Sequence, residues 1–241
     1  MKRVLYRDLG RMGYSECWQL QSSEFERMLS QKRVRSAQCE GASVACEGSF
    51  AEEDAGQLLL VEHNPVYTLG KSGKEQNMLV SEEYLRSIGA EFFHIDRGGD
   101  ITYHGPGQIV GYPILDLEQI GIGLREYIDS IEESIIGVCA EWGIEAGRIA
   151  GASGVWLEPE TKRARKICAI GVRASRYVTM HGFAMNVNTD LKYFSHINPC
   201  GFVDRGVTSL QRELGHEVDA EMVKSQIVKH LSEKLKIEIY K

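Results

Sequence analysis

The fold class of this sequence depends first on residues 166–186, KICAIGVRASRYVTMHGFAMN, which hold two strand-like runs. Apolar and small residues fill much of 166–174 and 178–186. A turn at Ser175-Arg176 would let the two runs pair. This stretch therefore predicts a pair of neighbouring strands.

Helices are predicted on both sides of this stretch. Ser15 is a plausible N-cap for a helix that runs towards Arg33, and Ser81 caps a second helix that ends at Gly89. Apolar residues at three- and four-residue spacing predict the longest helix, which Gly143 closes. The residues of this apolar stripe are Leu124, Ile128, Ile131, Ile135, Val138, Cys139 and Trp142.

Further short apolar runs between these helices are typical of strands. They are residues 58–61, 66–69, 91–95 and 154–157, and a run at 237–240 that follows a final helix over 220–235. Strands and helices occur without regular alternation, which favours an α+β (mixed α/β) fold over a parallel doubly wound sheet. We therefore expect a mixed sheet flanked by helices.

The chain of 241 residues is 43% hydrophobic, which suffices for a substantial core. No internal repeat or long linker divides it, so we expect one domain over residues 1–241. Residues 36–56 are small, polar and acidic, and cannot bury much apolar area. They are expected to form an exposed insertion.

Composition narrows the possible partners and location. The net charge of −6 provides no positive field for nucleic acid. No run of 18 apolar residues and no export signal is present, so a soluble, cytoplasmic protein is expected. The six cysteines lack the dense, even spacing of a disulfide framework, which favours reduced thiols.

Residues 97–108, RGGDITYHGPGQ, form the first dense candidate site. Four glycines allow tight turns and close approach of a ligand to the backbone. Polar contacts are available from Arg97, Thr102, Tyr103, His104 and Gln108. The stretch matches neither a P-loop nor a dinucleotide fingerprint. On its glycine content alone, a ligand loop and an ordinary Gly-rich hairpin are about equally good interpretations.

The second candidate site is Asn198-Pro199-Cys200-Gly201, where a cysteine lies on a constrained backbone whose N–H groups could stabilise an oxyanion. Free cysteines are more often buried small hydrophobes than nucleophiles. A reactive thiolate needs a cationic or basic neighbour. Lys166, His181 and His196 are the candidates, although Lys166 could instead extend to water and His181 could be structural.

The third candidate site is residues 181–188, HGFAMNVN, whose alternation of apolar or small residues with polar ones suits a half-buried strand. Gly182 and Ala184 would leave room for a slim acyl chain beside Phe183 and Met185.

Taken together, these three sites, with Val110, Tyr112 and Pro113 and with residues 166–171, resemble the lipoyl(octanoyl) transferase family, also called lipoate-protein ligase B. The resemblance spans about residues 58–210 and implies the biotin/lipoate protein ligase fold. It departs from the family at Cys168, where members commonly have a small residue, and in the length of the acidic 36–56 segment.

The resemblance implies transfer of an octanoyl group from acyl carrier protein to a lysine of lipoyl domains, through a thioester on Cys200. Lys166 corresponds to the lysine that lowers the pKa of this cysteine. Neither a cofactor nor a metal is implied. The implied acceptors are lipoyl domains of 2-oxoacid dehydrogenase complexes and the glycine-cleavage H protein, with no nucleic acid or membrane partner. The implied substrate-binding residues are Arg97, Gly98, Gly99, Asp100, Ile101, Thr102, Tyr103, His104, Ala169, Ile170, Gly171, Gly182, Phe183 and Ala184.

Three other functions compete with this one. An ATP-dependent lipoate or biotin ligase shares the fold group but does not need Cys200. A related transferase moves octanoyl between lipoyl-carrying proteins. A metal-binding module could use Cys168, His181, His196 and Cys200, of which only His196 and Cys200 have close spacing. Separately, the basic residues 162–165 could contact an acidic carrier protein or form an ordinary solvated turn.

Overall fold

The computed structural model describes residues 1–40, 54–198 and 206–241, and the side chains of all of these except 35–40. Cys200 and most of the 36–56 segment therefore lie outside the described residues. Within them, nine strands form one mixed sheet. In spatial order these are β12 (Ile237–Tyr240), β1 (Lys2–Met12), β2 (Gly56–His63), β6 (Gln108–Leu115), β10 (Val178–Asn186), β9 (Arg165–Ser175), β8 (Ala152–Leu157) and β7 (Gly147–Ile149), with β11 (Gly206–Val207) paired to β9.

Strand direction changes across this sheet. β12 and β2 both run parallel to β1, whereas the pairs from β2 through β6, β10, β9 and β8 to β7 are antiparallel. A second, three-stranded sheet has the order β4 (Glu91–His94), β3 (Val66–Leu69), β5 (Ile101–His104). The chain passes from β5 in the small sheet directly to β6 in the large one, through Gly105-Pro106-Gly107.

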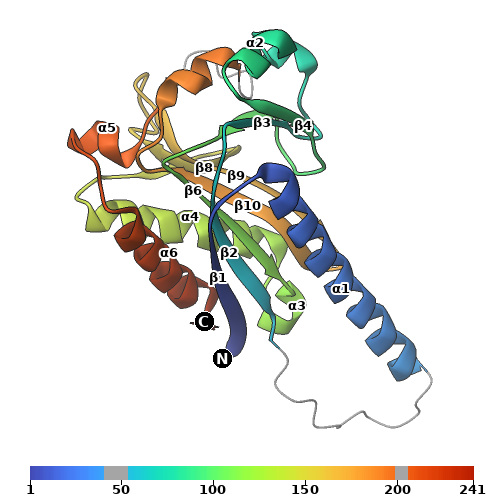
Figure 1. The fold of residues 1–241 in the computed structure, drawn as a ribbon. Coiled ribbons are helices and arrows are strands. Elements are labelled where there is room, and N and C mark those ends of the chain that lie inside the picture. Colours follow the sequence, from blue (N-terminus) through green and yellow to red (C-terminus); the bar gives the residue numbers. More distant parts are fainter. Residues whose placement is uncertain (41–53, 199–205) are drawn as a thin grey trace.

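Helices cover both faces of the large sheet (Figure 1). α1 (Tyr14–Glu40) lies on one face, and α4 (Leu124–Glu141) and α6 (Ala220–Leu235) lie together on the other. The shorter helices are α2 (Glu82–Ser87), α3 (Leu117–Ile120) and α5 (Leu210–Leu214), with 3-10 turns η1 (Glu75–Asn77) and η2 (Leu191–His196). Among the helices that the structure describes, none is both long and apolar enough to span a membrane.

β2 shows why central strands have continuous apolar sequences. Successive side chains of a strand point to opposite faces. Leu58 and Leu60 accordingly pack in the core that α4 and α6 complete, whereas Leu59 and Val61 pack in the core that α1 completes. Both faces of the strand are buried, so no polar alternation is needed.

The predicted fold class is confirmed, and the 166–186 stretch forms the expected pair of strands. Val178 of β10 pairs with Ser175 of β9, so Arg176 and Tyr177 form the turn, one residue later than predicted. Both turn residues have positive φ, 48° and 64°. That geometry matches the twist of an antiparallel hairpin even without glycine.

Several elements differ from the sequence-based expectation, since no strand was predicted at β1, β5, β6, β7 or β11 and no helix at α3 or α5. α1 continues to Glu40, beyond the predicted end near Arg33, so the polar segment expected from residue 36 begins as helix. β1 was not predicted, because its sequence, KRVLYRDLGRM, has scattered charges and only Val4 is fully buried. Its strand conformation comes from pairing with β2 and β12 on its two sides.

Candidate functional site

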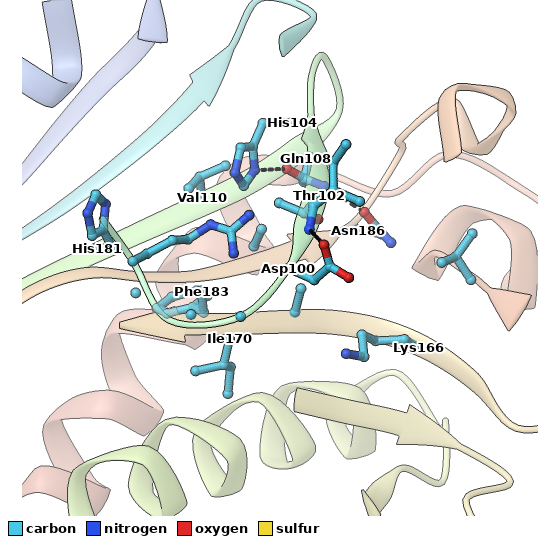
Figure 2. A pocket seen from close by; sticks show the side chains of 18 of the residues that line it. Asp100, Thr102, His104, Gln108, Val110, Lys166, Ile170, His181, Phe183 and Asn186 are labelled. Atoms are coloured by element: carbon cyan, nitrogen blue, oxygen red, sulfur yellow. Dashed lines mark hydrogen bonds between the residues drawn. The ribbon is translucent and has the colours of Figure 1, made fainter. Parts of the chain in front are cut away.

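A cavity of about 110 Å³ lies between the Gly-rich segment, the small sheet and the central strands β6, β10 and β9. Figure 2 shows Lys166 at one side of this pocket and His181 at the other, with Ile170 and Phe183 between them. The lining includes most of the residues predicted from the sequence: Arg97, Gly99, Asp100, Ile101, Thr102, His104, Lys166, Ala169, Ile170, Gly171, Gly182, Phe183 and Ala184.

Two of the predicted substrate-binding residues do not line the pocket. The backbone N–H of Gly98 donates to the carbonyl of Val172 at 3.0 Å, so Gly98 joins the Gly-rich segment to β9. The ring of Tyr103 is buried and stacks on Tyr193 with centroids 4.6 Å apart, in the core under the small sheet. Both residues therefore contact the elements that form the pocket wall and do not face the cavity.

Other lining residues were not among the substrate-binding residues implied by the resemblance, although Gln108, His181 and Asn186 lie within the candidate sites. These other lining residues are Tyr14, Gln108, Val110, Tyr112, Trp156, His181, Asn186, Phe194, Gly206 and Val207. Val110 and Tyr112, which are also part of the resemblance, lie two positions apart on β6 and therefore point to the same face of the sheet. Tyr14, Trp156 and Phe194 come from distant segments, and no local pattern connects them to the site.

The Gly-rich segment lies so close to β9 that Gly171 cannot carry a side chain without displacement. A Cβ added at Gly171 would lie 2.9 Å from the carbonyl oxygen of Gly98. The hairpin interpretation of residues 97–108 is wrong, because β5 pairs with β3 and not with β6, and the segment forms one wall of the pocket.

Replacing Gly171 with alanine is therefore expected to push the Gly-rich segment off β9. Overpacking of this kind lowers the free energy of unfolding by about 1–3 kcal/mol. Urea denaturation measures the effect, with Gly13→Ala as the control, because an added Cβ at Gly13 has nothing within 4 Å. Equal stabilities of the two variants would contradict the predicted close packing.

Hydrogen bonds hold several polar side chains of the pocket lining in place. Nε2 of Gln108 donates to the carbonyl of Tyr103 at 3.2 Å and to Oδ1 of Asn186 at 2.9 Å. Oε1 of Gln108 is therefore the acceptor, and Nδ1 of His104 donates to it at 2.8 Å (Figure 2). The guanidinium of the buried Arg97 donates to the carbonyl and hydroxyl of Thr68 at 2.8 and 3.0 Å.

His181 is held in an unusual conformation for a strand residue. Its φ is +61°, in the left-handed region that non-glycine residues seldom adopt. Nε2 of His181 lies 3.0 Å from Oδ1 of Asp96, and Asp96 also forms an ion pair with Arg173. Burial lowers the pKa of His181, although the Asp96 carboxylate opposes this effect. This histidine therefore closes the end of the pocket away from Lys166.

Neutral histidines lie beside this end of the pocket. Burial lowers the pKa of His63 to about 4 and, with a contribution from His63, that of His104 to about 3. The carbonyl of Met12 can only accept, so Nδ1 of His63 carries the proton and donates to it at 3.0 Å. Nε2 of His63 then accepts from the hydroxyl of Tyr112 at 2.9 Å.

These lowered pKa values predict acid destabilisation. Above pH 6.5 His63 is neutral in both states, but as the pH falls from 6.5 towards 4 the unfolded chain binds a proton that the folded protein excludes. Between pH 7 and 4.5, His63 should lower the free energy of unfolding by about 2–3 kcal/mol.

His63→Gln is expected to reduce the pH dependence of the free energy of unfolding, measured by urea denaturation. His94→Gln, at an exposed histidine, serves as the control and should leave it unchanged. Identical pH dependence in wild type and His63→Gln would refute the prediction.

Lys166 projects from β9 into the side of the pocket opposite His181 (Figure 2). Its Nζ donates to the carbonyl of Ser153 at 3.3 Å and lies 4.5 Å from the centroid of the Trp156 ring. The ammonium is thus held against an aromatic face, an arrangement that stabilises its charge. The alternative of a strand-end lysine extended into water does not describe this geometry.

Cys200 lies outside the described residues, but the chain on both sides of it is placed. Before it, the N–H of Asn198 donates to the carbonyl of Asn77 at 2.8 Å, and the side chain of Asn77 donates to Oδ2 of the pocket residue Asp100 at 2.6 Å. After it, Val207 of β11 pairs directly with Lys166. The pairing of Cys200 with Lys166 stays a prediction, and both flanks lead to the pocket.

Other sequence-based candidates have structural partners. Cys168 is fully buried in the core on the α4 side, and burial raises the pKa of its thiol. Nδ1 of His196 bonds to the hydroxyl of Tyr67 at 2.8 Å. Among the described residues, no group of three or more His, Cys, Asp or Glu side chains is arranged to hold a metal ion.

The basic residues 162–165 are largely neutralised within the chain. Arg163 pairs with Glu158 at 2.7 Å, and Arg165 pairs with Glu158 at 2.6 Å and Glu213 at 2.5 Å. These ion pairs favour an ordinary charged turn over a carrier-protein contact.

Comparison with known proteins identifies the family. The family model described as the lipoyl protein ligase A/B catalytic domain matches residues 42–232. The chain belongs to this family. Within the lipoyl protein ligase A/B catalytic domain, the matched residues include Lys166, Cys200 and all of the pocket lining except Tyr14.

Similar proteins of this family carry a more specific name. The octanoyltransferase of Bacteroides fragilis (strain ATCC 25285) is 55% identical over 218 residues, covering 90% of this chain and 91% of that protein. The octanoyltransferase of Flavobacterium johnsoniae is 50% identical over 239 residues, covering 99% of both.

Solved structures show the same lipoyl protein ligase fold at low sequence identity. A bipartite lipoate protein ligase from Thermoplasma acidophilum has a TM-score of 0.69 at 15% identity, covering 100% of this chain and 86% of that one. Lipoate-protein ligase A bound with ATP has a TM-score of 0.67 at 16% identity, covering 100% of this chain and 88% of that one.

Proposed function

We propose that this protein transfers an octanoyl group to a lysine of lipoyl domains in lipoate biosynthesis, through a thioester on Cys200. The observation that carries the proposal is the position of Lys166, in a pocket that Gly206 and Val207, which follow Cys200 in the chain, also line. The high identity to octanoyltransferases supports the acyl group named here. The donor is octanoyl-acyl carrier protein.

The pocket suits a slim, unbranched acyl chain. Ile170, Phe183 and Val110 provide apolar surface along it, and Gly171 and Gly182 provide walls without side chains. The ring of Phe183 occupies the space that a side chain at Gly111 would need, since a Cβ there would lie 2.2 Å from it. The octanoyl chain would lie along this surface with its carbonyl towards Lys166.

The first half-reaction forms the acyl-enzyme. The Cys200 thiolate attacks the thioester carbonyl of the donor, and the tetrahedral intermediate collapses with breakage of the pantetheine C–S bond. Lys166, as an ammonium ion, stabilises the Cys200 thiolate and donates a proton to the departing pantetheine thiolate. A thioester is already activated, so this exchange needs no ATP.

The second half-reaction forms the amide. The amine of the acceptor lysine attacks the Cys200 thioester, the C–S bond breaks, and the Cys200 thiolate is released. Lys166, left as a free amine by the first step, accepts the proton that the attacking amine loses. One side chain therefore serves both half-reactions and returns to its starting charge.

The proposed function also implies a location, a domain organisation and a set of acceptor proteins. We infer a cytoplasmic location, where Cys200 would remain reduced; the described cysteines Cys17, Cys139 and Cys168 are free thiols. Residues 1–241 act as one catalytic domain, with the 36–56 segment as an insertion into it. Lipoyl domains of 2-oxoacid dehydrogenases and the glycine-cleavage H protein are the proposed acceptors.

A comparison of donors tests this function. The protein is incubated with octanoyl-acyl carrier protein, with octanoate and ATP, or with octanoylated H protein, and the mass of the intact protein is measured before an unmodified lipoyl domain is added. We expect an octanoyl adduct, and then an octanoylated lipoyl domain, with the carrier protein. A product only with octanoate and ATP would indicate a ligase, and one only with H protein a transferase between lipoyl-carrying proteins.

A further inference from the structure

Glu132 is a buried carboxylate that the proposed mechanism does not use. It lies on α4, 5% exposed, on the face of the sheet opposite α1. Its Oε2 accepts from Nε of Arg148 at 2.7 Å, and its Oε1 accepts from the backbone N–H of Gly154 at 2.8 Å. Burial of a charged carboxylate is costly unless it is paired and hydrogen-bonded. Each carboxylate oxygen of Glu132 accepts a hydrogen bond, and one of the two donors is the positively charged Arg148.

The peptide group that Glu132 holds is also the one that contacts Lys166. The N–H of Gly154 and the carbonyl of Ser153 belong to one peptide, and in a trans peptide they point in opposite directions. Glu132 accepts from the N–H end at 2.8 Å, and the carbonyl end accepts from Nζ of Lys166 at 3.3 Å. A rigid peptide thus lies between a buried negative charge and the ammonium ion.

The backbone at this peptide departs from regular strand geometry. Gly154 has a φ of +121°, and a Cβ there would lie 2.5 Å from the carbonyl oxygen of Cys168. The pairing of β8 with β9 also shifts register between Val155 and Trp156. Irregularities of this kind redirect groups beside functional sites and persist only where the surroundings fix them. Glu132 provides a fixing contact on the side away from the pocket.

We propose that Glu132 is a positioning residue for Lys166, acting through the Ser153–Gly154 peptide. The carboxylate orients this peptide and polarises it, which makes the Ser153 carbonyl a better acceptor for the ammonium group. The inference rests on the proposed function, in which Lys166 lowers the pKa of the Cys200 thiol. Without Glu132 the ammonium group is less well placed, and the thiol is harder to ionise.

Other groups surround Lys166 and are common to all the variants compared. Trp156 packs on its ammonium, and Cys168 lies on its own strand. Arg97 and Asp100 line the same pocket from the Gly-rich segment. The neighbouring Arg165 is paired with Glu158 and Glu213. Because these groups are present in every Glu132 variant, a changed ionisation of Cys200 would report the loss of Glu132.

The test is the pH dependence of alkylation of Cys200 by iodoacetamide, followed on its own peptide by mass spectrometry. Glu132→Ala is expected to raise the apparent pKa of the thiol by at least half of the shift caused by Lys166→Ala, and a half-unit shift slows alkylation at pH 7 about threefold. Glu132→Gln keeps a carbonyl oxygen for the Gly154 N–H and should shift the pKa less. If Glu132→Ala fails to fold, Glu132→Gln still reports a shift towards higher pKa.

The matched control is Glu133→Ala. Glu133 pairs with the same Arg148 at 2.6 Å and with Lys234 at 3.9 Å but is 43% exposed at its side chain, so its loss removes ion pairs without touching the Ser153–Gly154 peptide. It should leave the alkylation profile unchanged. A double variant supplies the decisive comparison: in a Lys166→Ala background, Glu132→Ala should cause no further shift, because the group through which it acts is gone.

The outcomes separate this inference from the proposed function. If Lys166→Ala shifts the profile but both Glu132 variants match wild type, the role of Glu132 is wrong and that of Lys166 stands. A Glu132→Ala shift that persists in the Lys166→Ala background, or that Glu133→Ala reproduces, also overturns the positioning role. If Lys166→Ala itself leaves the profile unchanged, the role of Lys166 in the proposed function fails, and this inference fails with it.

Discussion

Replacement of Cys200 with alanine is expected to abolish the octanoyl-enzyme and to reduce transfer to a lipoyl domain by at least about three orders of magnitude, since removal of a catalytic nucleophile leaves only binding and electrostatic effects. Intact-protein mass spectrometry after incubation with octanoyl-acyl carrier protein measures the adduct. Cys200→Ser should lose it as well, because an unactivated hydroxyl is a far weaker nucleophile than a thiolate.

Cys168→Ala is the matched control for this experiment. Cys168 lies two residues from Lys166, but its thiol is fully buried and burial raises its pKa, so it cannot attack a thioester in the pocket. This variant should form the octanoyl adduct as wild type does. An adduct that survives in Cys200→Ala, on any cysteine, would refute the assignment of the nucleophile.

Local sequence patterns predicted those parts of the fold in which periodicity and burial agree. The apolar stripe of α4, apart from the exposed Leu124, and the doubly buried runs of β2 and β10 are examples, because most side chains there are buried. β1 was missed for the opposite reason. Hydrogen bonds join it to a strand on each side, and its partners there, such as Gln57 in β2 and Ile237 in β12, lie far from it in the sequence.

Some residues of the candidate site could be predicted from the sequence and others could not. Residues 97–104 form a local cluster of glycines and polar residues, whereas 169–171 were predicted only from the resemblance to the family. Trp156 could not be predicted, since its contact with Lys166 requires β8 to lie beside β9 with a shifted register. Glu132 belongs to a helix whose pattern indicates only packing. Its contact with Gly154 appears once α4 is placed against the sheet.

Replacement of Lys166 is expected to have the second large effect, because the proposed mechanism uses it in both half-reactions. Lys166→Ala should lower the rate of each by about 10²–10⁴-fold, the range typical of a general acid or base. Single-turnover measurements with octanoyl-acyl carrier protein, and then with a lipoyl domain added to preformed octanoyl-enzyme, give the two rates separately. Lys162→Ala, in the exposed turn just before β9, is the control and should leave both rates unchanged.

Lys166→Arg separates the two roles of the lysine. A guanidinium can pack on Trp156 and keep a positive charge near Cys200, so the alkylation profile of Cys200 should stay close to that of wild type. It does not lose its proton at accessible pH, so it cannot accept one from the attacking amine. The guanidinium also cannot donate a proton to the pantetheine thiolate, so we expect the acyl-enzyme to form more slowly than in wild type and then to persist when a lipoyl domain is added. Turnover of Lys166→Arg at the wild-type rate would contradict proton transfer by Lys166 and leave it only the role of stabilising the thiolate.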